Sequence, residues 1–234
     1  QASCLFLFPF PFFRRMNFRW KIAQFFEHLW WRWYLLGKSQ AGYLAWKRQY
    51  WQGFLKKAQL EIGKTERLLE VGCGAAGVFL MFPENPVTAV EPLFEKYRRF
   101  FSHLQNGSFP NTTFYPVAFE KYHRDEPFDH IFCLNVINHV ADLPVCMGKL
   151  ARLTIPGGNL AMTVDAHNFL FFKRLFRLVP ADILHPHQFD LNEYLEKLQG
   201  AGFQTERVEL LRKGFIFNYY LLIAKRASKA LSAL

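Results

Sequence analysis

The sequence contains few cysteines, and their spacing excludes the common cysteine-based sites. Only four occur among 234 residues, none stands in a CxxC pair, and no histidine lies at metal-ligand spacing from one. This pattern argues against a zinc site and against a disulfide framework, so we predict no bound metal. Unpaired, scattered cysteines are typical of a reducing compartment, and we therefore expect a cytoplasmic protein. The four residues are Cys4, Cys73, Cys133 and Cys146.

An apolar run long enough to cross a membrane is also lacking at the N-terminus. The run at 5–13 is nine residues long and contains two prolines, which makes it too short for a bilayer and too broken for a signal-peptide core. Its basic pair, Arg14-Arg15, follows the run, whereas a signal peptide carries its charge in front. Met16 could be the true start, so the sequence leaves open whether residues 1–15 are native or an over-extended N-terminus.

Acidic residues are nearly absent from the first sixty positions. Residues 1–60 hold ten Lys and Arg against one acid, Glu27, and all six tryptophans of the chain. The formal net charge of +10 is therefore concentrated at one end. Such a segment could lie on an anionic membrane, bind nucleic acid through phosphates and stacking, or pack on the core as a lid. We favour the lid. Peripheral membrane contact through residues 16–60 stays open, and nucleic acid is the weaker alternative.

Residues 16–64 are predicted to form a helical extension. Apolar side chains recur at helical spacing over 17–36, and Gly37 ends that pattern. Ser39 can cap a second helix. The apolar stripe of this second helix would run through four aromatic side chains, with the basic residues facing elsewhere. The stripe consists of Tyr43, Trp46, Tyr50 and Phe54.

After residue 66, short apolar runs alternate with helical stretches. This alternation is typical of an α/β fold with a doubly wound, mostly parallel sheet. Two final apolar runs are separated only by residues 212–214, which predicts an antiparallel hairpin at the end of a domain that spans 65–227. The expected strands are 68–71, 86–91, 113–117, 130–134, 159–164, 203–211 and 215–224, seven in all, and the expected helices are 75–81, 93–104, 143–153 and 190–199.

A glycine-rich turn follows the first predicted strand and precedes a predicted helix. Gly72, Gly74 and Gly77 have the spacing GxGxxG, which lets a backbone approach a ligand closely. Glu91 ends the second strand, where an acid can accept hydrogen bonds from both hydroxyls of an adenosine ribose. Because nicotinamide dinucleotides and S-adenosylmethionine share that ribose, this pattern by itself does not separate the two cofactors.

Three further motifs resemble those of the class I S-adenosylmethionine-dependent methyltransferases. They are E-V-G-C-G at 70–74, F-D-H-I-F-C-L-N-V-I-N-H-V at 128–140 and L-T-I-P-G-G at 153–158. The resemblance covers about 66–225 and is closest to the broad group that includes the ubiquinone and menaquinone C-methyltransferases. It implies a Rossmann-like fold, S-adenosylmethionine as cofactor and methyl transfer as the reaction.

The resemblance also assigns cofactor contacts. The glycine loop would pass under the methionine part, Glu91 would take the ribose diol, and the turn after strand 113–117 would contact adenine. Many relatives carry an Asp in that turn, whereas this chain has A-F-E at 118–120, so Phe119 stacking and backbone contacts take its place. The complete predicted set is Glu70, Gly72, Cys73, Gly74, Gly77, Glu91, Pro92, Leu93, Ala118, Phe119, Leu134 and Asn135.

Methyl transfer needs a general base only when the acceptor arrives protonated. His139, on a predicted helix start, and His185 and His187, after the fifth strand, are the candidates for that role. A packing or capping role for His139, and a solvated loop for the other two, are the alternatives.

Hydrophobic patterning gives the best indication of the acceptor. The fourth strand ends L-N-V-I at 134–137 in place of the (N/D)PP(Y/F) tetrad of enzymes that methylate exocyclic amino groups. The aromatic and basic stretch at 169–177, together with the N-terminal extension, favours a hydrophobic small molecule such as a quinone precursor, lipid or secondary metabolite, methylated on O or C. An RNA or protein methyltransferase, a non-catalytic binding protein of the same fold and an NAD-dependent oxidoreductase are the alternatives.

Overall fold

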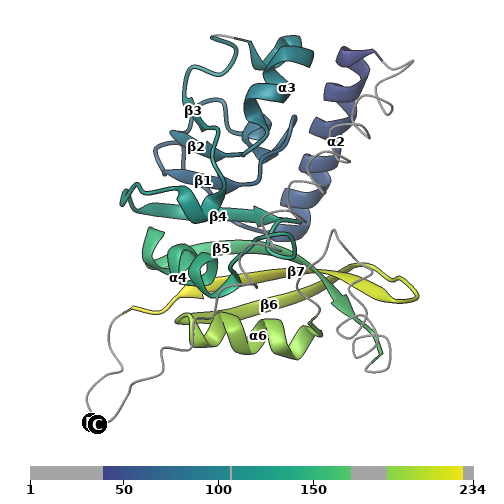
Figure 1. Cartoon of the computed structure of the whole chain (residues 1–234), viewed down its shortest axis with the longest axis vertical. Helices are drawn as coiled ribbons and strands as arrows, with labels where there is room; N and C mark the ends of the chain where they lie inside the picture. The colour runs from purple at the N-terminus through teal and green to yellow at the C-terminus, as the bar shows by residue number, and fades with distance from the viewer. Residues whose placement is uncertain (1–38, 106, 170–188, 229–234) are drawn as a thin grey trace, which may run out of the picture.

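A computed structural model of the chain describes residues 39–105, 107–169 and 189–228 (Figure 1). Within these ranges no helix is both long and apolar enough to cross a membrane. Several predicted features lie outside the described residues, namely the segment 1–15, the helix 17–36, most of the stretch 169–177, and the side chains of His185 and His187.

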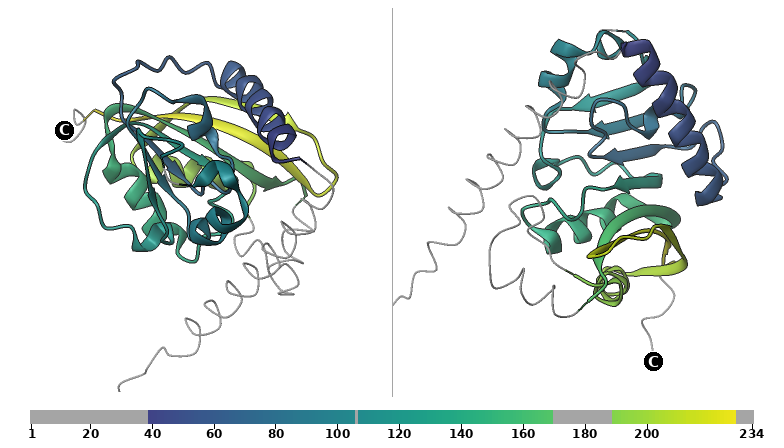
Figure 2. Two further views of the ribbon diagram at one scale, coloured as in Figure 1. Left: turned by 90° about the horizontal axis from the view of Figure 1, so that it is seen from above. Right: turned by 90° about the vertical axis from the view of Figure 1, so that its right-hand side faces the viewer.

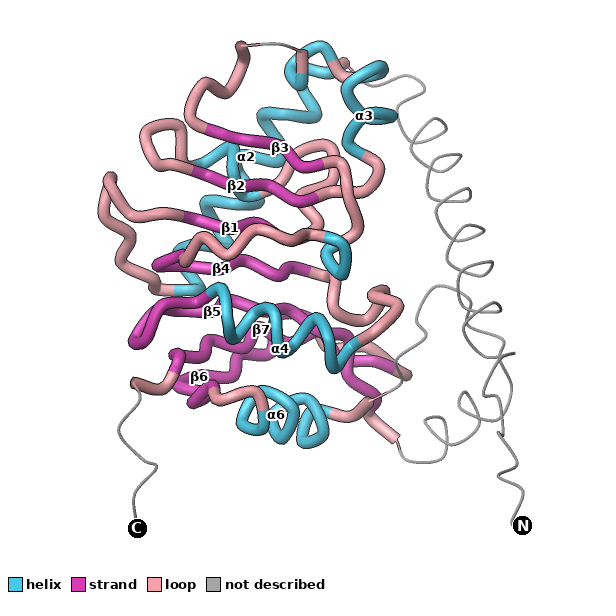
Figure 3. Tube along the Cα trace, turned by 60° about the vertical axis from the view of Figure 1, so that its left-hand side comes forward, coloured by secondary structure: helices cyan, strands magenta, loops and turns pink. Residues whose placement is uncertain are grey.

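The described residues form a seven-stranded sheet with the order β3-β2-β1-β4-β5-β7-β6 (Figure 3). The first five strands are parallel, and β7 lies between β5 and β6, antiparallel to both. This arrangement confirms the predicted mostly parallel sheet with a C-terminal hairpin. The strands are β1 (Leu68–Val71), β2 (Val87–Val90), β3 (Thr112–Tyr115), β4 (Phe128–Leu134), β5 (Thr154–His167), β6 (Phe203–Arg212) and β7 (Phe217–Arg226).

Helices cover both faces of the sheet, and each face has its own hydrophobic core (Figure 2). Every residue of β1 and β2 is buried, as expected for parallel strands covered on both sides. Successive residues alternate between the two cores, so Leu68 belongs to one and Leu69 to the other. The helices are α2 (Gln40–Ala58) and α3 (Phe94–Phe100) on one face, and α4 (Leu143–Leu153) and α6 (Leu191–Gly200) on the other.

The predicted helix at 75–81 is wrong. The chain instead forms one short 3-10 turn, η1 (Val78–Met81), before it returns to the sheet at β2. Gly77 stays extended, and the first two N–H groups of η1 donate to the buried Glu70 carboxylate. Pro83 follows two residues after the turn, and a proline cannot continue a helix from there. The Glu70 side chain therefore accepts from N–H groups at the start of this turn, which have no partner within a helix.

Helix α2 begins at the predicted cap and buries part of the predicted stripe. The Ser39 hydroxyl accepts a hydrogen bond from the Gly42 N–H, which confirms the cap. Tyr43 and Phe54 of the stripe are buried, whereas its other two members, Trp46 and Tyr50, are 51% and 42% exposed and Trp51 is only 7% exposed. The stripe is shifted because the Trp51 indole N–H donates to a buried carbonyl, that of Ala76, at 3.0 Å. The helix is therefore oriented by this polar contact as well as by its apolar residues.

Hydrogen bonds tie both ends of α2 to the domain. At the N-terminus, the Gln40 side chain donates to Phe100 O and accepts from Ser102 N–H, at 2.9 and 3.0 Å. At the C-terminus, the Arg207 guanidinium of β6 donates to Lys57 O and Ala58 O, where a cation also complements the helix dipole. The helix thus packs as an integral part of the α/β core.

Trp51→Phe should loosen α2 because it removes the indole N–H and leaves the Ala76 carbonyl without that donor. We expect a loss of about 1–2 kcal/mol in the free energy of unfolding, measured by denaturant titration. The matched control is Trp46→Phe on the exposed side of the same helix, which should stay within about 0.5 kcal/mol of wild type. Equal effects from the two substitutions would contradict the anchoring role of Trp51.

Candidate active site

The turn after β1 requires glycine at its first position. Gly72 has φ +70°, and a Cβ there would collide with the Val136 side chain, which follows β4. Its N–H donates to Val90 O at 2.7 Å, which carries the β1–β2 pairing into the turn. Gly74 also has a positive φ, +58°, but no atom lies within 4 Å of the position that a Cβ would take. The backbone at Gly74 therefore borders open space beside the turn.

The Glu91 carboxylate holds this turn against the end of β2. Its Oε2 accepts from Gly74 N–H at 3.0 Å, and its Oε1 accepts from Leu93 N–H at 2.9 Å. The side chain is only 7% exposed. A carboxylate oxygen can accept more than one hydrogen bond, so the hydroxyl groups of a ribose are chemically suitable donors to this side chain.

A second buried carboxylate, Glu70, lies behind the turn. It is 2% exposed and accepts from Val78 N–H at 2.7 Å and Phe79 N–H at 2.9 Å. Burial raises the pKa of Glu70 to about 7, opposed by these hydrogen bonds and by the charge of Lys47. A Cβ on Gly77 would collide with the Glu70 carboxylate and lie 2.7 Å from Cys73 O. The third glycine of the pattern is thus required by the carboxylate.

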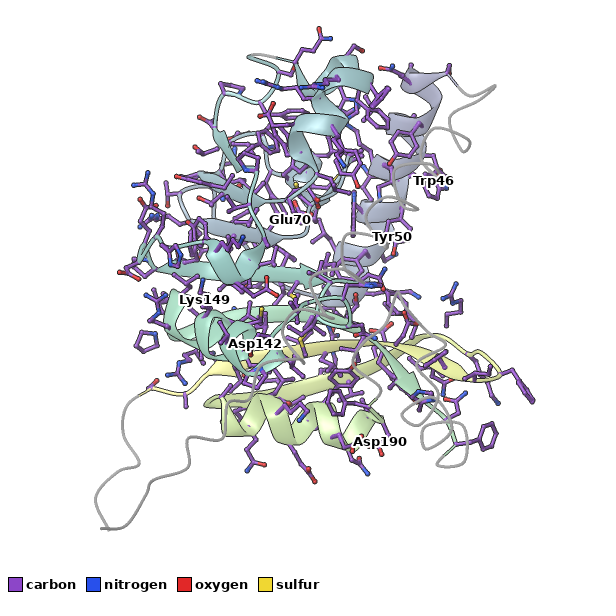
Figure 4. The ribbon with its side chains drawn as sticks, in the orientation of Figure 1. Trp46, Tyr50, Glu70, Asp142, Lys149 and Asp190 are labelled. Carbon is purple, nitrogen blue, oxygen red and sulfur yellow. The ribbon has the colours of Figure 1, made fainter. Side chains whose placement is uncertain are left out.

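Helix α2 brings a lysine to the same region. The Lys47 ammonium lies 4.5 Å from the centroid of the Trp51 ring and 5.3 Å from that of Tyr50. Burial lowers the pKa of Lys47 to about 8, and the charge of Glu70 opposes that shift. Figure 4 shows Trp46 and Tyr50 on successive turns of α2, with Glu70 at the end of β1 beside that helix. Lys47 was not among the site residues predicted from the sequence. The aromatic residues one position before it and three and four positions after it were the signal that could have identified it.

Hydroxyl groups of β5 and β7 lie next to the end of β4. Asn135, directly after β4, has φ +58° and donates its N–H to Thr163 Oγ1 at 2.7 Å. Thr163 Oγ1 lies 2.7 Å from the Tyr219 hydroxyl, and Tyr219 interacts electrostatically with Tyr50 of α2. Burial raises the pKa of Tyr219 well above its usual range. Nothing in the sequence signalled this arrangement, because Tyr219 reaches Thr163 only through the insertion of β7 beside β5.

The turn after β3 holds the predicted adenine contacts. Ala118 is half-buried, but the Phe119 ring is only 4% exposed and packs against Tyr122. Glu120 accepts from Ala141 N–H at 2.6 Å and so joins this turn to the turn after β4. Lys149 fixes it further by donating to Phe119 O, Glu120 O and Tyr122 O. The backbone around Ala118 is therefore better exposed to a ligand than the ring of Phe119.

The remaining predicted residues fall around the same edge of the sheet. Pro92 and Leu93 follow Glu91, and Leu134 ends β4, next to Asn135. Cys73 is buried, and burial raises the pKa of its thiol well above the usual range, so it stays a thiol. His139 is half-buried in a turn before α4, so its predicted place on a helix start is wrong. The structure brings together the predicted cofactor contacts that follow β1, β2 and β4.

Gly77→Ala tests the packing of the glycine turn against Glu70. The added methyl group has no room, and we expect a loss of about 1–3 kcal/mol in the free energy of unfolding. The matched control is Gly53→Ala within α2, where nothing lies within 4 Å of the added carbon and helix propensity should instead add about 0.5–1 kcal/mol. Calorimetric melting of both variants is the measurement. A neutral Gly77→Ala variant would contradict the contact with Glu70.

Comparison with known proteins places the fold in a family. Residues 43–208 match the model of a methyltransferase domain. An uncharacterized methyltransferase of Schizosaccharomyces pombe is 30% identical over 112 residues, which cover 42% of this chain and 39% of the relative. The chain thus spans about two fifths of the length of the curated relative that it matches.

Solved structures are similar over most of the domain. The 1,6-didemethyltoxoflavin-N1-methyltransferase of Burkholderia thailandensis, bound to 1,6-didemethyltoxoflavin and S-adenosylhomocysteine, has a TM-score of 0.62 and 12% identity over 97% of this chain and 94% of its own. The geranyl diphosphate C-methyltransferase of Streptomyces coelicolor, also with S-adenosylhomocysteine, has a TM-score of 0.58 and 13% identity over 77% and 81%. The family match confirms the methyltransferase family, and the similar structures confirm the Rossmann-like fold class predicted from the sequence. The chain belongs to the methyltransferase domain family.

Proposed function

We propose that this chain transfers the methyl group of S-adenosylmethionine to an oxygen or carbon atom of a hydrophobic small molecule. The observation that carries the donor half is the bond between Glu91 and the Gly74 N–H at 3.0 Å. It joins a buried carboxylate, suited to a ribose diol, to a glycine turn that borders open space. Glu91, proposed to bind the ribose, and the glycine turn, proposed to contact the methionine part, are therefore joined by a direct hydrogen bond.

Each cofactor contact has a proposed role. The glycine turn (Gly72, Gly74 and Gly77) would lie under the methionine part, and Glu91 would accept from the ribose hydroxyls. Pro92 and Leu93 would flank adenine, together with the backbone at Ala118. The carbonyl groups of Leu134 and Asn135 would accept from the amino group of the methionine part. The turns that follow β1, β2, β3 and β4 would then enclose the donor at the carboxyl edge of the sheet.

Methyl transfer from a sulfonium needs little acid or base catalysis by the protein. The bound donor would supply an electrophilic methyl group on a sulfonium, and the acceptor atom would take that methyl group as the thioether leaves in line. The chain contributes alignment of the acceptor and exclusion of water, to which α2 is suited because it is fixed over the glycine turn. A protonated acceptor would also need a base. His139, His185 and His187 remain proposals for that role, and the last two lie outside the described residues.

The acceptor class follows from the side chains that α2 presents. Trp46 is 51% exposed and Tyr50 is 42% exposed, and Tyr50 interacts electrostatically with Tyr219 of β7. Aromatic surface with one hydroxyl favours an apolar acceptor that carries a polar group. The two similar enzymes named above act on small molecules, 1,6-didemethyltoxoflavin and geranyl diphosphate, which supports this class. Membrane contact through residues 16–60 stays a prediction, because residues 16–38 lie outside the described ranges.

The topology weighs against a nicotinamide-dependent oxidoreductase. Dinucleotide-binding folds typically have six parallel strands in the order 3-2-1-4-5-6. Here an antiparallel β7 separates β5 from β6. The glycine spacing alone does not distinguish a methyltransferase from an oxidoreductase, whereas the antiparallel strand β7 between β5 and β6 favours the methyltransferase.

Glu91→Gln tests the donor site. The substitution keeps the volume of the side chain but removes its charge and one of its two acceptor oxygens, and we expect S-adenosylmethionine to bind about tenfold more weakly or worse. Calorimetric titration with S-adenosylmethionine and NADH is the measurement, and NADH should give no heat. Glu84→Gln is the control, because that carboxylate is exposed in a surface ion pair with Lys64. No S-adenosylmethionine binding to wild type, or NADH binding in its place, would end the proposal.

An acceptor screen tests the substrate class. Release of S-adenosylhomocysteine should rise with apolar phenols, enols and hydroxylated lipids, because these match the aromatic surface and its hydroxyl group. RNA and protein preparations should give only the background rate. Turnover confined to RNA or protein would instead favour the macromolecular alternative and assign the basic N-terminal segment to substrate binding.

A further inference from the structure

Three charged side chains surround the glycine turn, and their roles are not equivalent. Glu70 and Glu91 are both anionic acceptors, only 2% and 7% exposed. The hydrogen bonds that both carboxylates accept from backbone N–H groups explain their positions beside the turn. Lys47 differs from them, because it comes from α2 and contributes no hydrogen bond to the turn. A function for this cation has to be sought in what it faces.

The Lys47 ammonium is fixed without an oxygen partner among the described residues. Its neighbours there are the rings of Trp46, Tyr50 and Trp51, at 5.8, 5.3 and 4.5 Å from the ring centroids. The charge of Glu70 also acts on it, although no hydrogen bond or ion pair joins the two side chains, and the Glu70 oxygens accept from backbone N–H groups. An ammonium has three N–H donors. Aromatic faces stabilise the charge but leave its capacity for strong hydrogen bonds to an anion unused.

The aromatic residue closest to this ammonium is itself bonded to the glycine turn. The Trp51 indole N–H donates to Ala76 O at 3.0 Å, so the Trp51 ring lies against the turn. In addition, His103 Nε2 lies 2.8 Å from Ala75 O. These two bonds fix the Ala75–Ala76 backbone, and through Trp51 they fix the distance between α2 and the turn. The cation is therefore held beside the stretch of chain proposed to lie under the methionine part of the donor.

The donor carries one anionic group, the α-carboxylate of its methionine part. We propose that Lys47 binds this carboxylate. The inference rests on the proposed function, since it names one more contact of the same site. Charge matching supports it: the amino group of the donor is assigned to the carbonyl groups of Leu134 and Asn135 and the ribose to Glu91, whereas the carboxylate needs a cation, which Lys47 of α2 supplies beside the turn. An amphipathic helix outside the glycine motif would thereby take part in donor recognition.

The test compares two ligands that differ only in that carboxylate, S-adenosylmethionine and decarboxylated S-adenosylmethionine. Wild type should prefer the carboxylate form by about tenfold or more. Lys47→Met keeps the apolar stem beside the rings, and it should weaken binding of S-adenosylmethionine by about tenfold while binding of the decarboxylated form changes less than about twofold. The readout is the ratio of the two dissociation constants, measured by titration calorimetry on the full chain.

Control variants separate the role of Lys47 from the proposed function of the whole site. Lys56→Met, an exposed lysine of the same helix, should leave both dissociation constants unchanged. Lys47→Gln is a second neutral variant, and it should give the same ratio of the two dissociation constants as Lys47→Met. It provides the test if Lys47→Met folds poorly. An equal loss for both ligands, or an unchanged ratio, would overturn the role of Lys47 and leave the donor site intact. Failure of wild type to bind either ligand would instead overturn the proposed function.

Discussion

A carboxylate buried at the end of the first strand is the constraint on which the rest of this site depends. Removing a charge from water costs several kcal/mol unless the protein supplies partners. Glu70 obtains two backbone N–H groups from Val78 and Phe79. The chain after β1 must therefore bend back over the carboxylate, and Gly77 must lack a side chain because the Glu70 oxygen occupies that space. Local solvation of one acid thus sets the shape of the loop.

Helix α2 extends this constraint to the rest of the domain. Trp51 donates to the carbonyl of Ala76 in the same loop, and Arg207 of β6 donates to the C-terminal carbonyls of the helix. Tyr50 interacts electrostatically with Tyr219 of β7. One helix therefore contacts both the glycine turn and the C-terminal hairpin, which are far apart in sequence. A movement of α2 would change the loop, the Lys47 ammonium and the Tyr219 hydroxyl together. This coupling gives a physical reason for the helix to precede the first strand of the sheet.

The sequence predicted the sheet well because its signals are local. Short apolar runs with turns between them located all seven strands, Ser39 located the start of α2, and the glycine turn located the end of β1. The predictions that proved wrong depended on contacts between distant residues. At 75–81 the chain stays extended at Gly77, packed against the Glu70 carboxylate, and Pro83 follows the single turn at Val78–Met81. Likewise, helical spacing alone could not select Trp51 over Tyr50 for burial, because the Ala76 carbonyl that decides it comes from another element.

The same distinction applies to the two halves of the proposed site. The proposed donor contacts come from backbone at the ends of parallel strands and from one acid, and the strand order brings these ends together. The side chains proposed to face the acceptor come from α2 and β7, which lie far apart in the sequence, and Thr163 of β5 lies 2.7 Å from the Tyr219 hydroxyl. Acceptor choice in this chain is therefore expected to follow from α2 and the hairpin. Substitution of Tyr219 should alter it while leaving donor binding intact, because Tyr219 belongs neither to the glycine turn nor to the rings around Lys47.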